Sequence, residues 1–142
     1  HDSPITYRRS VRPNDASEWT DEEPVGPGVY PSVVCASNDT LFVSAQLHDT
    51  GDAVLLVRPK GGKWEQRQLV ERGDEYAGTF AACLPGLAVA RDDTLHFVCN
   101  LQRGKGGVPG LHQAVCSMRS RDGGWTWEKA DKLRIVVIPL RK

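Results

Sequence analysis

A ten-residue segment occurs twice in the chain, and this internal repeat restricts the possible folds more than any other feature of the sequence. Residues 38–47 (NDTLFVSAQL) align with residues 92–101 (DDTLHFVCNL) at an offset of 54 positions. In each copy, turn-forming residues are followed by an apolar run and preceded by another short run, at residues 32–35 or 87–90. This order is typical of a β-hairpin. We therefore expect a chain that uses one all-β unit more than once.

Each hairpin is followed by two further strand-like segments. After the first hairpin come residues 53–57, a Pro-Lys-Gly-Gly turn and residues 64–70; after the second come residues 111–118, an Asp-Gly-Gly turn and residues 125–129. A tryptophan, Trp64 or Trp127, lies early in each fourth segment. Four strands per repeat favour the blades of a β-propeller. A β-sandwich, whose strands recur at similar spacing, is the alternative.

The repeat divides the chain into parts of one propeller segment that covers residues 1–142. We expect the end of one blade at 1–28, complete blades at 29–72 and 78–131, and the start of a next strand or blade at 132–142. Residues 5–9 and 18–20 are expected to be strands of the first, partial blade, joined by a long turn. The other predicted strands are 32–36, 40–47, 53–58, 64–70, 87–90, 94–101, 111–119, 125–129 and 133–138.

Composition excludes several classes of protein. Lys plus Arg and Asp plus Glu both number 18, so a net charge of zero argues against a broad surface for nucleic acid or an anionic membrane. No apolar run approaches the roughly 20 residues that span a bilayer. The four cysteines form no C-x-x-C pair, so we expect no metal site and no cofactor. Cys35, Cys99 and Cys116 lie in apolar runs and are predicted to be buried thiols, with one or two disulfides as the alternative.

Residues 120–127 (SRDGGWTW) match the pattern S-x-D-x-G-x-T-W at every fixed position. This segment resembles the Asp box, or BNR repeat, of sialidase-like β-propellers. We expect a structural role, because an Asp side chain can bond its own turn, Gly permits a positive φ and Trp packs between sheets. The resemblance places the box between the third and fourth strands of a blade, away from the ligand. Its fixed positions are Ser120, Asp122, Gly124, Thr126 and Trp127.

Residues 1–10 (HDSPITYRRS), followed by Pro13, Asp15 and Trp19, resemble a BNR-repeat subgroup that includes ulvan-lyase-like polysaccharide lyases. Tyr30-Pro31 and residues 78–80 (GTF) fit the same pattern. The resemblance implies an all-β, partial sialidase-like propeller of about two four-stranded blades, in a secreted or periplasmic protein. It also implies missing blades, so we expect a longer parent chain or self-association through an apolar face near residues 133–140.

Uronate polysaccharide lyases cleave by β-elimination, which needs a base, an acid and a donor that stabilises the charge on the carboxylate. The resemblance implies His1 and Tyr30 as catalytic residues. Gln46 stands where the subgroup has an arginine, and Asn100 shares its repeat position, so Gln46, His48 and Asn100 are predicted to bind substrate. Structural alternatives are a frayed terminus for His1, a packing role for Tyr30, caps for Gln46 and Asn100, and an exposed loop for His48.

The sequence therefore predicts part of a carbohydrate-active propeller, most like a polysaccharide lyase that acts on uronic-acid glycans. A non-catalytic propeller that binds glycan or protein is the alternative. A sialidase-like hydrolase is less favoured, because the Arg-Ile-Pro signature is absent. The expected partner is a polysaccharide, with no nucleic acid and no membrane.

Overall fold

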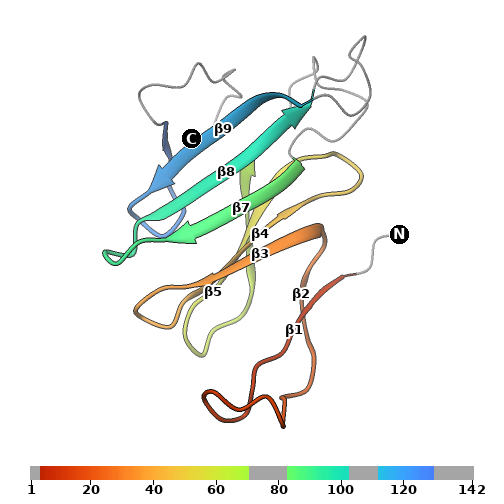
Figure 1. Cartoon of the computed structure of the whole chain (residues 1–142), viewed down its shortest axis with the longest axis vertical. Helices are drawn as coiled ribbons and strands as arrows, with labels where there is room; N and C mark the ends of the chain where they lie inside the picture. Colours follow the sequence, from red (N-terminus) through yellow and green to blue (C-terminus); the bar gives the residue numbers. More distant parts are fainter. Residues whose placement is uncertain (1–3, 71–82, 103–111, 130–142) are drawn as a thin grey trace.

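The computed structural model describes residues 4–70, 83–102 and 112–129, and these residues form only β-strands, turns and loops (Figure 1). A two-stranded antiparallel sheet consists of β1 (Ile5–Tyr7) and β2 (Glu23–Gly26). Two four-stranded antiparallel sheets follow, each with its strands in chain order. The first contains β3 (Val29–Cys35), β4 (Leu41–Gln46), β5 (Ala53–Arg58) and β6 (Glu65–Val70). The second contains β7 (Cys83–Val89), β8 (Leu95–Gln102), β9 (His112–Ser120) and β10 (Glu128–Lys129).

The all-β prediction is confirmed, although one expected strand is reduced to a bridge and one observed strand was not expected. The four-stranded sheets lie within residues 29–72 and 78–131. The strand expected at 18–20 is a single bridge between Ser10 and Trp19, and the partner of β1 is instead β2. Sequence reasoning missed β2 because this four-residue strand contains a proline and has only one buried residue, Val25, so it shows no alternation. The strand expected at 133–138 lies outside the described residues.

The internal repeat extends to the register of the strands. Val29 pairs with Gln46 in the first sheet, and Cys83 pairs with Asn100 in the second. In both hairpins the register then shifts across the next two residues. A proline, Pro31 or Pro85, is the second residue of each irregular stretch; a bulge accommodates it because proline has no N–H for the ladder.

The two hairpin turns also share their geometry. Asp39 and Asp93 both adopt a positive φ, 65° and 62°, which a short polar side chain tolerates better than a bulky one. The residue before each of them, Asn38 or Asp92, accepts a hydrogen bond at Oδ1 from the backbone N–H two positions later. The two copies of the repeat are therefore alike in hydrogen bonding as well as in sequence.

The first four-stranded sheet is covered on both faces. All but one residue of β4 and of β5 are buried, which explains why these segments lack an apolar-polar alternation. Val25, Val43 and Leu56, with partly buried Ile5, Tyr7 and Trp64, form a small core on the side of β1 and β2. The larger core joins the two four-stranded sheets and contains Ala36, Phe42, Ala53, Leu55, Val57, Leu69, Leu87, Leu95, Phe97, Cys99 and Met118.

The predicted burial of the cysteines is wrong for Cys35. Its thiol is exposed, because side chains alternate along β3 and the neighbouring Val34 is the residue that packs against the core. Cys99 is buried as predicted. The side chains of Cys83 and Cys116 lie outside the described part of the chain.

Candidate functional site

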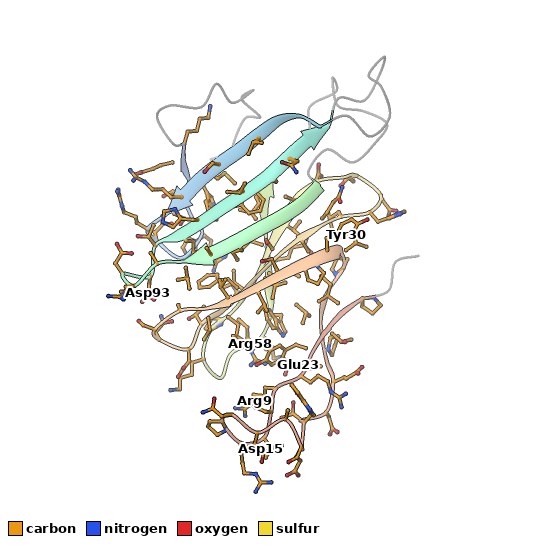
Figure 2. The ribbon with its side chains drawn as sticks, viewed as in Figure 1. Arg9, Asp15, Glu23, Tyr30, Arg58 and Asp93 are labelled. Atoms are coloured by element: carbon orange, nitrogen blue, oxygen red, sulfur yellow. The ribbon has the colours of Figure 1, made fainter. Side chains whose placement is uncertain are left out.

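The strand register brings four of the predicted site residues to the same end of the two four-stranded sheets. Tyr30 follows Val29, which pairs with Gln46 at the end of β4, and His48 lies in the loop directly after β4. Asn100 occupies the equivalent position of the second sheet, where it pairs with Cys83. Figure 2 shows Tyr30 at this end of β3, far from Glu23 and Arg58. His1 lies outside the described residues.

Tyr30 has an unusual backbone. Its φ of 54° lies in the left-handed region, which is rare for a bulky residue, and it precedes Pro31, where an extended backbone is normal. Its side chain is 52% exposed, so little packing offsets this strain. A residue in such a strained backbone conformation lowers the stability of the fold by about 1–3 kcal/mol, and such residues are concentrated at functional sites. Sequence reasoning singled out Tyr30 through its motif but did not predict the strain.

Gln46 is completely buried, at 0% exposure. It lies on the same face of β4 as Phe42, which packs in the core between the four-stranded sheets. Within the described structure, neither Oε1 nor Nε2 of its amide has a hydrogen-bond partner. A buried polar group in this state costs about 1–3 kcal/mol. Asn100, at the equivalent position of the second sheet, is partly exposed. Equivalent positions of the two hairpins therefore have different surroundings.

His48 lies in a compact loop that joins β4 to β5. The N–H of Leu47 donates to the carbonyl of Asp52, and the N–H of Gly51 donates to the carbonyl of Leu47, each at 2.8 Å. The His48 side chain is 48% exposed, and its Nδ1 lies 3.9 Å from Oδ1 of Asp49. The loop therefore presents His48 to solvent, near the end of the strand that carries Gln46.

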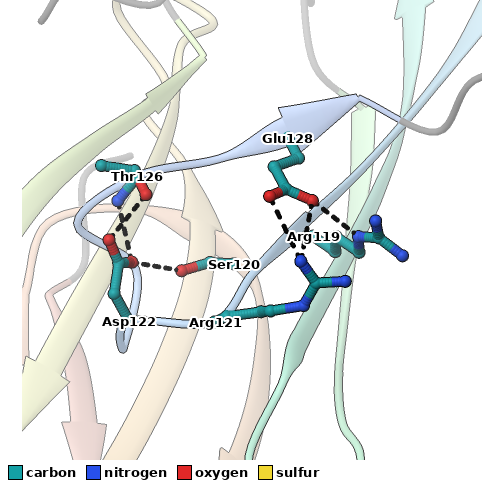
Figure 3. A network of polar contacts seen from close by, with 6 residues as sticks. All are labelled: Arg119, Ser120, Arg121, Asp122, Thr126 and Glu128. Atoms are coloured by element: carbon teal, nitrogen blue, oxygen red, sulfur yellow. Dashed lines mark hydrogen bonds and ion pairs between the residues drawn. The ribbon is translucent and has the colours of Figure 1, made fainter.

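The turn at residues 120–127 is organised around one carboxylate (Figure 3). Oδ1 of Asp122 accepts hydrogen bonds from the backbone N–H groups of Trp125 and Thr126 and from Oγ of Ser120, at 2.8–3.0 Å. Oδ2 accepts from the Thr126 hydroxyl at 2.6 Å, and the Ser120 hydroxyl accepts from the N–H of Gly124 at 2.8 Å. Although desolvation opposes the shift, these donors lower the pKa of Asp122 from 3.8 to about 2.

The same turn packs tightly against the first four-stranded sheet. Gly124 has a φ of +89°, and a Cβ added there would lie 2.4 Å from Cδ2 of Leu55. Nη1 of Arg67 donates to the Gly123 carbonyl at 2.7 Å, and its guanidinium lies 3.8 Å from the centre of the Trp125 ring. Trp127 packs against the core between the sheets. These contacts give the turn a structural role.

This turn lies far from Tyr30 and Asn100 along the strands. Ser120 pairs with Leu95 at the start of β8, whereas Asn100 lies near the end of that strand. Exposed Glu128, just past the turn, accepts a hydrogen bond from Nε of Arg119 at 2.9 Å and forms an ion pair with Arg121 (Figure 3). The contact with Arg119 connects β10 to β9, and the contact with Arg121 connects β10 to the turn.

A cleft near the hairpin turns was not predicted from the sequence. It has a volume of about 510 Å³. Its lining comes from three separate segments, namely the end of β1 with the residues after it, the β3–β4 hairpin and the end of β5 with the turn after it, so no local motif could indicate it. The lining residues are Tyr7, Arg9, Cys35, Asp39, Leu41, Arg58, Lys60, Gly61 and Gly62.

No protein-family model matches the sequence, and no curated protein is significantly similar to it. Within the described ranges, no group of three or more His, Cys, Asp or Glu side chains could hold a metal ion. The same part of the chain contains no helix that is long and apolar enough to cross a membrane. Function is therefore inferred from the residues and their arrangement.

Proposed function

We propose that the chain is part of a sialidase-like β-propeller with BNR repeats, and that it acts on carbohydrate. Two four-stranded sheets with strands in chain order and equivalent hairpin registers support this architecture. The 120–127 segment supports it as well, because Asp122 bonds its own turn as an Asp box would. Trp127 packs against the core between the sheets, as the resemblance implies.

Exposed apolar side chains on the second four-stranded sheet support the proposal that further blades are present. Val98 is 43% exposed, whereas Ser44, its equivalent 54 positions earlier, is fully buried on the face of β4 that also carries Phe42. Val115 is also exposed, at 46%. A further blade or a second copy of the chain would cover this surface. Size-exclusion chromatography with light scattering tests this, and a monomer that melts cooperatively would argue for a self-contained sandwich instead.

The proposed activity is polysaccharide cleavage by β-elimination on uronic-acid glycans. The observation that carries it is Tyr30, a half-exposed phenol on a strained backbone at the strand end that Gln46 and His48 share. A base removes the proton beside the carboxylate, the electron pair forms a C=C bond, and the bond to the glycosidic oxygen breaks as an acid protonates that oxygen. We assign to Tyr30 a proton transfer at its phenol oxygen, with His1 as the second catalytic group that the resemblance implies.

Product formation tests the lyase proposal directly. The chain is incubated with ulvan and with other uronate polymers, and unsaturated uronate is followed by its ultraviolet absorbance. We expect Tyr30→Phe, which removes only the phenol oxygen, to lower the rate at least about 100-fold while the melting temperature is unchanged. Equal rates for both proteins would remove Tyr30 from the mechanism, and no product on any uronate polymer would exclude the lyase activity.

A non-catalytic glycan-binding propeller is the second candidate, and the surroundings of Gln46 favour it. This residue has no positive charge, and its amide is fully buried, so it does not neutralise a substrate carboxylate as an arginine would. Saturable binding of an uronate oligosaccharide without any unsaturated product would support this candidate. Turnover would exclude it.

A further inference from the structure

The cleft near the hairpin turns contains three basic side chains. Arg9, Arg58 and Lys60 line it together with the ring of Tyr7, and its volume of about 510 Å³ is in the range of small-ligand sites. It lies at the end of the first four-stranded sheet where Cys35 pairs with Leu41, opposite the end where Val29 pairs with Gln46. The cleft is thus separate from the site proposed around Tyr30.

Arg58 is held in a fixed position in this cleft. Its Nη1 forms an ion pair with Oε1 of Glu23, and the indole N–H of Trp64 donates to the same oxygen at 2.6 Å. The guanidinium lies 4.9 Å from the ring centre of Tyr7 and 5.4 Å from that of Trp64. A guanidinium has five N–H donors. The contact with Glu23 uses Nη1, and the side chain stays 20% exposed, so Arg58 can present other donors to a ligand.

The other two basic groups are more accessible. Among the described residues, no carboxylate lies within ion-pair distance of the exposed Arg9 guanidinium. Nζ of Lys60 lies 2.8 Å from Oδ2 of Asp39, and both of these side chains are mostly exposed. An exposed ion pair of this kind is weak, so Lys60 can exchange Asp39 for another anion.

We propose that this cleft binds a small monoanionic ligand through a carboxylate or sulfate group. Three basic side chains face two carboxylates, those of Asp39 and Glu23, so the cleft has one excess positive charge. One excess charge suits a carboxylate or a sulfate ester better than a dianion. The planar donors of Arg58 and Arg9 match the oxygens of such groups.

Binding can be followed on the chain itself by NMR, because one tryptophan lies beside Arg58 and another lies in the separate 120–127 turn. The indole N–H of Trp64 bonds Glu23 beside Arg58, whereas the indole N–H of Trp127 bonds the Gly124 carbonyl in the 120–127 turn. The probes are glucuronate as the carboxylate, glucose 6-sulfate as the sulfate ester, and glucose as the neutral sugar. We expect at least one of the two anions, and not glucose, to shift the Trp64 signal in a saturable way while the Trp127 signal stays in place.

Variants then test which basic side chains bind the anion. We expect Arg9→Gln and Lys60→Gln each to weaken binding of the anion about tenfold. Arg12→Gln is the matched control, since Arg12 has the same charge on the same hairpin but pairs with Asp15 and Glu18 outside the cleft. It is expected to change affinity less than about twofold.

Three results would overturn the proposal. The first is that neither anion shifts the Trp64 signal, and the second is that glucose shifts it equally. The third is that Arg12→Gln and Arg9→Gln lose the same affinity for the anion. The proposal does not rest on the lyase activity, and Tyr30→Phe is expected to leave the Trp64 titration unchanged. Failure of one proposal is therefore distinguishable from failure of the other.

Discussion

Replacing Gly124 with alanine places a methyl group where the side chain of Leu55 lies. The added Cβ would be 2.4 Å from Cδ2 of Leu55, and the φ of +89° is unfavourable for any residue with a Cβ. Gly61 offers a matched control, because its φ is +67° and nothing lies within 4 Å of its added Cβ. The two substitutions share the backbone cost and differ in the steric cost.

The expected magnitudes follow from these two costs. A left-handed backbone costs an alanine about 1–2 kcal/mol, so Gly61→Ala should lower the free energy of unfolding by this amount. Overpacking of a core adds about 1–3 kcal/mol. Gly124→Ala should therefore lower the free energy of unfolding by about 2–5 kcal/mol.

Urea denaturation followed by tryptophan fluorescence measures both values. Leu55→Ala in the Gly124→Ala background removes the methyl group that the new Cβ meets, so the double variant should be more stable than the sum of the single changes predicts, by about 1–3 kcal/mol. Equal costs for Gly124→Ala and Gly61→Ala, or additive effects of Gly124→Ala and Leu55→Ala, would refute the proposed packing of this turn.

Three further predictions concern charge and backbone strain. Because the folded pKa of Asp122 is lowered from 3.8 to about 2, its contribution to stability should be complete above about pH 4 and lost as the pH falls toward 2, and Asp122→Asn should remove this part of the pH dependence of unfolding. Tyr30→Gly should raise the free energy of unfolding by about 1 kcal/mol through relief of its positive φ, and a lower melting temperature would contradict this. Asp93 accepts a hydrogen bond from the N–H of Ser37 at 2.8 Å, which joins the hairpin turns of the two sheets, so Asp93→Ala should lower the urea midpoint of unfolding. The equivalent Asp39→Ala, at a similar positive φ, removes an exposed ion pair with Lys60 and should lower that midpoint less.

Local chemistry was sufficient to predict several parts of the structure. The repeated Asp-Thr-Leu segments define hairpins whose turns depend on nearby side chains, so their shared geometry follows from the shared sequence. The same holds for the 120–127 turn, where every hydrogen bond of Asp122 joins residues at most four positions apart. Strand 23–26 was missed because a short strand with one buried residue has no periodic pattern.

Only the tertiary structure decided how far each strand is covered. Gln46 and Asn100 occupy equivalent positions of the repeat and of the two hairpins, yet Gln46 is completely buried and Asn100 is partly exposed. The cleft of Arg9, Arg58 and Lys60 likewise could not be predicted from the sequence, because its lining residues come from segments that are far apart along the chain. Sequence patterns fix a residue's side of its own strand, whereas burial and pocket formation depend on which other segment packs against that side.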